Sequence, residues 1–228
     1  MRARTAPVAD VMTPLPIVEF YFDPISPYAW LAARQCARLD PVGRLEFRPV
    51  LFAGLLSAHG NKGPAELPAK RAYTMRDVIR CAGRLGVPMR GPPTHPFNPL
   101  RALRMCTALD DPLKRRRFAL ALFEAAWERG LDLTDDAVLA HVAADCGLDS
   151  AELLARAADP EIKRRLAEAT EAAIAAGVFG VPTFCVDGEL FWGADRIDAV
   201  LWRLQGHRTD EALLGEVLAR PASAARKP

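Results

Sequence analysis

Cysteine is scarce in this sequence, and the few cysteines are not paired by spacing. The five residues, Cys36, Cys81, Cys106, Cys146 and Cys185, are scattered and form no C-x-x-C motif. An odd, dispersed set predicts neither a disulfide framework nor a zinc site. We therefore expect reduced, mostly buried thiols and no metal site.

Long hydrophobic runs and an excess of charge are also missing. No stretch of about 18 apolar residues occurs, and residues 1–16 contain no apolar core of the length found in signal peptides. We therefore expect a cytoplasmic protein that does not bind membranes. The 30 lysines and arginines nearly balance the 28 aspartates and glutamates, giving a formal net charge of +2. Because the basic residues form no long tail, nucleic-acid binding has little support.

The composition that remains is that of an ordinary globular protein, with 50% hydrophobic and 25% charged residues. The 228 residues exceed the usual size of one small domain. They are enough for a core domain with a sizeable insertion, without a second independent fold.

The N-terminal part predicts a strand, a helix and a second strand. Residues 17–22 are rich in β-branched and aromatic side chains, which predicts a buried strand. A helical pattern covers residues 28–39, with Pro27 suited to the first turn and Ser26 at the N-cap. Residues 45–51 alternate in polarity and predict a second strand, parallel to the first.

The rest of the chain is first helical and then returns to strands. From about residue 64 to 177 only helical periodicity is present. Strand patterns follow at residues 183–186 and 189–192, and the Asp187-Gly188 pair between them is a strong hairpin signal. A helix over residues 195–204 completes this part.

The order of these elements predicts the fold class. A βαβ unit, a long helical segment and a ββα unit indicate an α/β protein with a thioredoxin-like core interrupted by an all-helical insertion. A last short helix opens at Thr209. The predicted parts are a thioredoxin-like domain (17–60 and 178–205), a helical insertion domain (61–177) and flexible ends (1–16 and 221–228).

Ser26 is the first candidate functional residue. A helix N-terminus has unpaired N–H groups and a partial positive charge, which favour a thiolate placed there. A serine hydroxyl can donate a hydrogen bond to such a thiolate, and a free thiol with a pKa near ~8.5 is only a minority thiolate at neutral pH. The alternative is an ordinary N-cap that stabilises the helix by about 1 kcal/mol.

Two later motifs could contact the same ligand. If the Val181-Pro182 bond is cis, the backbone N–H and C=O of Val181 are free to pair with a peptide-like ligand. Asp195 follows Trp192-Gly193 near the start of a predicted helix, where its carboxylate and backbone amides could hold the charged end of a ligand. The alternatives are a trans proline at the first residue of a strand and a simple helix cap.

Four ordered motifs together resemble a known family. The motifs are Phe20-Tyr21-Phe22-Asp23-x-x-Ser26-Pro27-Tyr28-x-Trp30-Leu31, Gly60-Asn61-Lys62-Gly63-Pro64, Gly177-Val178-Phe179-Gly180-Val181-Pro182-Thr183 and Trp192-Gly193-x-Asp195-Arg196. In order and spacing they resemble the 2-hydroxychromene-2-carboxylate isomerases, and kappa-class glutathione transferases share the pattern closely. The resemblance runs from about residue 17 to 204.

This resemblance implies a DsbA-like thioredoxin fold with a helical insertion, bound glutathione as the cofactor, and a homodimer. It implies that Ser26 replaces the first redox cysteine and contacts the glutathione sulfur, with Asn61 beside it. Val181 would pair with the cysteinyl backbone and Asp195 would hold the γ-glutamyl end. At Ala194 the kappa class usually has serine, so a hydroxyl contact is lost there while the backbone N–H remains. The residues implied to bind glutathione are Ser26, Asn61, Val181, Pro182, Ala194 and Asp195.

The resemblance also implies a reaction on a small aromatic substrate. The glutathione thiolate would add to a conjugated carbon of 2-hydroxychromene-2-carboxylate, the ring would open, a former double bond would rotate, and elimination would return the thiol. Negative charge on the substrate favours cationic or N–H donors near the sulfur. For His95 and Asn98 a purely structural role in their loop is equally open. The substrate candidates are Tyr28, Lys62, His95 and Asn98, with Arg71 and Arg101 as further cations.

Other functions remain as alternatives. A kappa-class-like transferase or peroxidase acting on electrophiles would use the same thiolate site, and net consumption of glutathione would separate it from an isomerase. A binding or redox-sensing module would bind glutathione without turnover. A serine hydrolase is disfavoured because no G-x-S-x-G motif surrounds Ser26. A dithiol oxidoreductase is excluded because Ala29 stands where the second cysteine would be.

Overall fold

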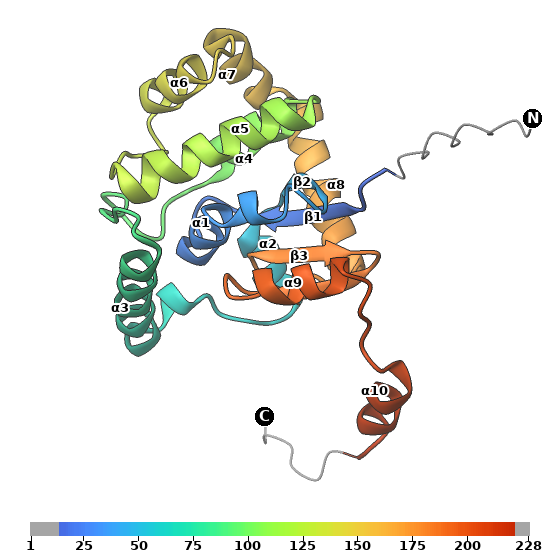
Figure 1. Ribbon diagram of the computed structural model, residues 1–228. Coiled ribbons are helices and arrows are strands. Elements are labelled where there is room, and N and C mark those ends of the chain that lie inside the picture. Colours follow the sequence, from blue (N-terminus) through green and yellow to red (C-terminus); the bar gives the residue numbers. More distant parts are fainter. Residues whose placement is uncertain (1–13, 222–228) are drawn as a thin grey trace, which may run out of the picture.

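A four-stranded sheet forms the centre of the protein, whose computed structural model describes residues 14–221 (Figure 1). The strand order is β2, β1, β3, β4. β1 (Ile17–Phe22) pairs in parallel with β2 (Arg44–Pro49) and antiparallel with β3 (Thr183–Val186), which continues into β4 (Glu189–Trp192). The turn residues Asp187 and Gly188 have φ of 49° and 84°, the positive values that a tight hairpin requires. The predicted strands and hairpin are confirmed.

The first helix is shorter than predicted. α1 covers Pro27–Ala33, and a short 3-10 helix, η1 (Cys36–Arg38), replaces the last part of the predicted helix. Between them the side-chain amide of Gln35 donates to the carbonyl oxygen of Ala194 at 3.3 Å. This contact ties the break in the helix to the segment that precedes α9 (Ile197–Leu204).

A helix that the sequence patterns do not predict follows β2. α2 (Phe52–Ala58) has no side-chain cap from its own N-cap residue, Leu51. The carboxylate of Asp23 instead accepts the N–H of Phe52 at 3.0 Å, and the hydroxyl of Thr170 accepts the N–H of Leu51 at 3.0 Å. These partners lie 29 and 119 positions away in the chain, so the start of α2 is set by tertiary contacts.

The segment between the two parts of the sheet is helical, as predicted. Asp111, Asp135, Asp149 and Asp159 cap four of its helices by accepting N–H groups of the first turn. Its last helix packs against α2 and β2 (Figure 1), and the domain boundaries given above stay a prediction. The elements are η2 (Pro64–Glu66), α3 (Pro68–Leu85), α4 (Leu100–Ala108), α5 (Pro112–Phe123), the π-helical turn η3 (Glu124–Glu128), α6 (Asp136–Asp145), α7 (Ser150–Ala158) and α8 (Pro160–Ala175).

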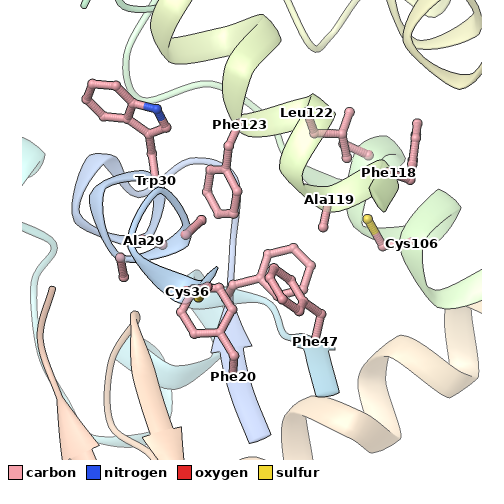
Figure 2. Packing of buried hydrophobic residues seen from close by; sticks show 14 of the residues in the cluster. Phe20, Ala29, Trp30, Cys36, Phe47, Cys106, Phe118, Ala119, Leu122 and Phe123 are labelled. Atoms are coloured by element: carbon pink, nitrogen blue, oxygen red, sulfur yellow. The ribbon is translucent and has the colours of Figure 1, made fainter. Parts of the chain in front are cut away.

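One hydrophobic core joins the sheet to the helical insertion (Figure 2). Phe20 and Phe47 from neighbouring strands meet edge to face with ring centroids 4.9 Å apart. Phe22 lies 5.7 Å from Phe123 of α5, and both are almost fully buried. Aromatic pairs of this kind add about 0.5–1.5 kcal/mol to the hydrophobic stabilisation. α5 is therefore held firmly on the sheet.

The remaining features agree with a globular chain. In the range 14–221 no helix is long and apolar enough to cross a membrane. All five cysteines are free, and only Cys81 is more than marginally exposed. The last helix, α10, covers Glu211–Leu218 and is capped by Asp210 rather than Thr209. The flexible ends predicted at 1–16 and 221–228 lie outside the described residues, apart from 14–16 and 221.

Candidate active site

A cleft of about 1260 Å³ opens beside the start of α1 and brings together residues from all four sequence motifs. Its walls come from α1, the loop after α2, α3, the loop before β3 and the segment before α9. Asn98 and Arg101 do not line it. The predicted site residues that do are Ser26, Tyr28, Asn61, Lys62, Arg71, His95, Val181, Pro182, Ala194 and Asp195.

Ser26 is the N-cap of α1, as predicted. Its Oγ accepts the N–H of Ala29 at 3.2 Å, and its hydroxyl donates to the carbonyl oxygen of Val181 at 3.4 Å. The second bond is much longer than the usual 2.7–2.8 Å or so between two oxygens. The hydroxyl hydrogen is therefore weakly held and can turn to a stronger acceptor in the cleft, so capping does not prevent a chemical role.

The loop before β3 exposes a short stretch of backbone. The Val181-Pro182 bond is cis. The carbonyl oxygen of Val181 accepts the weak bond from Ser26, and its N–H has no backbone acceptor within residues 14–221. The loop is held by bonds from Thr183 Oγ1 to Gly180 O at 2.7 Å and from Gly193 N to Pro182 O at 3.0 Å. A peptide-like ligand can therefore pair with Val181 on a fixed edge.

Asp195 does not cap a helix. The N-cap of α9 is Arg196, and no side chain caps this helix. The exposed carboxylate of Asp195 pairs with the guanidinium of Arg196 at 2.9 Å, at the rim of the cleft. Gly193 has φ of 128°, and a Cβ added there would lie 2.6 Å from Asp195 Oδ1. Glycine is thus required for the carboxylate to lie where it does.

The cationic side chains divide into two groups. Lys62 and Arg71 line the cleft, and within the described part of the chain neither forms an ion pair with a carboxylate. Asn61 precedes Lys62 in the exposed loop after α2. Arg101 instead pairs with Asp136 at 2.8 Å and does not line the cleft.

Tyr28 connects two walls of the cleft. Its hydroxyl donates to Asp77 Oδ2 on α3 at 2.9 Å. Burial raises the pKa of this phenol, and the bond to the Asp77 carboxylate raises it further. Tyr28 therefore keeps its proton at neutral pH and holds α3 against α1.

The loop between α3 and α4 separates the two remaining candidates. His95 Nε2 lies 3.1 Å from the carbonyl oxygen of Ile25, and burial lowers the pKa of its imidazole. Asn98 is exposed, and its Oδ1 accepts the N–H of Leu100 at 3.0 Å near the start of α4. The substrate role proposed for Asn98 is therefore not supported, because its side chain serves the adjacent helix.

Sequence reasoning missed one titratable group in the cleft wall. Asp23 is fully buried, and its carboxylate accepts the N–H of Ile25 and of Phe52, each at 3.0 Å. Burial raises its pKa to about 7, although the two N–H donors oppose this shift. The available signal was an aspartate directly after a buried strand, three positions before the candidate serine.

Comparison with known proteins identifies the family of this chain. Residues 17–205 match the family model described as a DSBA-like thioredoxin domain. The chain is 32% identical to glutathione S-transferase kappa 1 of Homo sapiens, covering 90% of this chain and 96% of that protein. It is 31% identical to 2-hydroxychromene-2-carboxylate isomerase of Sphingobium xenophagum, covering 79% of this chain and 94% of that protein.

A solved structure extends the likeness to three dimensions. A 2-hydroxychromene-2-carboxylate isomerase matches with a TM-score of 0.78 at 25% identity, covering 90% of this chain and 100% of that chain. The fold therefore agrees with that of this isomerase over most of the chain. The chain belongs to the DsbA-like thioredoxin family, in the group that includes the kappa-class glutathione transferases and the 2-hydroxychromene-2-carboxylate isomerases.

Proposed function

We propose that this protein is a glutathione-dependent cis-trans isomerase. Its substrate is 2-hydroxychromene-2-carboxylate or a similar aromatic hydroxy-keto acid, and the product of the former is trans-o-hydroxybenzylidenepyruvate. The observation that carries the proposal is the composition of the cleft: the weakly held Ser26 hydroxyl and the open Val181 edge lie in the same cleft as the unpaired cations Lys62 and Arg71.

The residues of the cleft fit glutathione group by group. Glutathione is a tripeptide with one thiol, an ammonium group and two carboxylates. The Ser26 hydroxyl can donate to the sulfur, and the backbone of Val181 can pair with the cysteinyl residue. Asp195 offers an exposed carboxylate to the ammonium group, and Arg196 a cation to the carboxylate beside it. This match between donors and ligand supports glutathione as the cofactor.

The chemistry that glutathione supplies is a nucleophilic thiol that adds reversibly to a conjugated carbon. The protein's contribution is to stabilise charge. A hydrogen bond from Ser26 to sulfur favours the thiolate over the thiol. Lys62 and Arg71 can bind the substrate's carboxylate and stabilise negative charge that develops on its keto oxygen. The Tyr28 hydroxyl gives its one hydrogen to Asp77, so toward a ligand in the cleft it can only accept.

The test is an absorbance assay of the equilibration of 2-hydroxychromene-2-carboxylate with its trans product, with and without glutathione. The native protein should be active only when glutathione is present. Replacing Ser26 with alanine removes a hydrogen bond to a charged group, worth about 1.5–3 kcal/mol. We therefore expect the rate at saturating substrate to fall by about 10- to 100-fold.

Asp149→Ala provides a matched control. Asp149 caps α7 by accepting the N–H of Glu152 at 2.9 Å, outside the cleft. Both substitutions remove an N-cap and cost about 1 kcal/mol of stability. Only Ser26→Ala also removes a hydroxyl from the cleft. If native protein with glutathione shows no isomerisation, or if Asp149→Ala loses as much activity as Ser26→Ala, the proposal is wrong.

A kappa-class-like transferase or peroxidase is the second candidate. It is favoured by the 32% identity to glutathione S-transferase kappa 1, which is as high as the 31% identity to the isomerase relative. A transferase consumes glutathione, whereas an isomerase returns it. Measuring the free thiol after many turnovers, with 2-hydroxychromene-2-carboxylate and with a simple electrophile in parallel, separates the two activities.

A further inference from the structure

Within the turn that carries Ser26, one backbone hydrogen bond joins the N–H of Ser26 to the carbonyl oxygen of Asp23 at 3.0 Å, and side chains satisfy the polar groups between them. Between β1 and α1 the carbonyl oxygen of Pro24 accepts the Trp127 Nε1–H at 2.9 Å. The N–H of Ile25 donates to Asp23 Oδ1 at 3.0 Å, and the carbonyl oxygen of Ile25 lies 3.1 Å from His95 Nε2. Three successive polar groups of this turn thus depend on three different side chains.

These side chains also support one another. Trp127 is fully buried in η3, and the ring of His95 meets it edge to face with centroids 5.4 Å apart. The carbonyl oxygen of Trp127 accepts the N–H groups of Arg90 and Gly91 at 2.8 and 3.0 Å, which anchors the loop that carries His95. Trp127 therefore fixes both the Ser26 turn and the loop that contacts it.

The hydrogen-bond geometry defines the state of His95. A carbonyl oxygen can only accept, so Nε2 must carry the hydrogen. Nδ1 is buried and, within residues 14–221, has no hydrogen-bond partner. A proton on Nδ1 would be a buried donor without an acceptor, and both burial and the charge of Arg71 disfavour it. His95 is thus a neutral donor whose one N–H is committed to the backbone of Ile25.

We propose that His95, Trp127 and Asp23 are positioning residues that hold the turn before Ser26 so that its hydroxyl can stabilise a thiolate bound in the cleft. This inference rests on the proposed use of glutathione. It assigns His95 to the support of Ser26 instead of to the substrate. Because the bond from Ser26 to Val181 is long, at 3.4 Å, the hydroxyl itself contributes little to fixing the turn.

The direct test measures the pKa of the glutathione thiol bound to the protein, from the ultraviolet absorbance of the thiolate as pH is varied. His95→Leu and Trp127→Phe should each raise this pKa by about one pH unit, which lowers the ratio of thiolate to thiol about tenfold at any given pH. The dissociation constant of glutathione should change less than about threefold, since contacts along its backbone remain. His95→Gln keeps an N–H donor and should restore most of the native pKa.

Phe118→Leu is the matched control, because Phe118 is fully buried in α5 and takes no part in the hydrogen bonds from Trp127, Asp23 and His95 to this turn. It should lower stability without moving the thiol pKa. The proposal is overturned if His95→Leu leaves the thiol pKa unchanged, if Phe118→Leu raises it equally, or if His95→Gln behaves like His95→Leu.

A second measurement keeps the inference separate from the proposed function. If calorimetry shows that native protein binds no glutathione, the proposed function fails, and hydrogen exchange of the turn amides then tests the positioning role alone. In His95→Leu the N–H groups of Ile25 and Ser26 should exchange at least about tenfold faster relative to those of β1, and in Phe118→Leu they should not. Equal ratios in both variants refute the positioning role.

Discussion

Replacing Asp23 with asparagine should remove a pH dependence of stability that the buried carboxyl imposes. In the folded protein burial raises its pKa from 3.8 to about 7. As pH rises between these values, the unfolded chain releases this proton and the folded protein keeps it, so the unfolded state binds fewer protons. The free energy of unfolding therefore falls as pH increases through this window and levels off above about 7.

The size of the effect follows from the same pKa. At about 1.36 kcal/mol per pH unit, the interval from 3.8 to about 7 corresponds to at most about 4 kcal/mol. The amide side chain of the Asp23→Asn variant would supply one acceptor for the two N–H groups of Ile25 and Phe52, at a cost of about 1–3 kcal/mol at every pH. The native protein should thus be the more stable one at low pH, and its advantage should shrink or reverse at high pH.

The assay is urea unfolding of both proteins at several pH values between about 4.5 and 8.5, comparing the difference in unfolding free energy. Titration of every other group cancels in that difference. Asp111→Asn is the matched control, because Asp111 also accepts two backbone N–H groups, at 2.8 and 3.2 Å, but its side chain is exposed. A difference for Asp23→Asn that is flat across this range would refute the reasoning.

Substitutions at three positions test other parts of the structure. Gly193→Ala puts a Cβ 2.6 Å from Asp195 Oδ1, so we expect glutathione binding measured by calorimetry to weaken about tenfold or more, and the strain of alanine at a φ of 128° should also lower the melting temperature. Glu128→Leu leaves the buried Nε1–H of Trp30 without its acceptor at 2.9 Å and should cost about 2–3 kcal/mol in urea unfolding, whereas Glu128→Gln should cost less than half of that. Ser26→Ala should lower the unfolding free energy by about 1 kcal/mol through loss of the cap, and no loss would mean that the bond to Ala29 contributes nothing.

Local chemistry explains which elements could be predicted. The hairpin at Asp187-Gly188 and the N-cap at Ser26 depend on residue types that favour one backbone conformation, so a short stretch of sequence is sufficient. The same reasoning failed for α2, whose start is stabilised by Asp23 and Thr170 from distant parts of the chain. The sequence of residues 52–58 carries no information about those two partners, so it could not predict the helix.

In the cleft, too, some residues could be predicted from local sequence and others depend on the folded structure. The motifs identified Ser26 and Val181, and the structure brings them into contact. Asn98 and Arg101 do not line the cleft, and residue type gave no information on whether a polar side chain would find a nearer partner in Leu100 or Asp136. Asp23 went unnoticed for the opposite reason, since only the folded chain shows that it is buried.

The contact between Ser26 and Val181 also bears on how the protein is made. It joins positions 155 residues apart, and the whole helical insertion lies between them. Contacts that close so long a loop form late in folding, because the entropy of closure must be met first. While β3 is still inside the ribosome, the nascent chain has no cleft, even if its helices have already folded. Under the proposed function, retention on immobilised glutathione would therefore select completely folded molecules from a synthesis reaction.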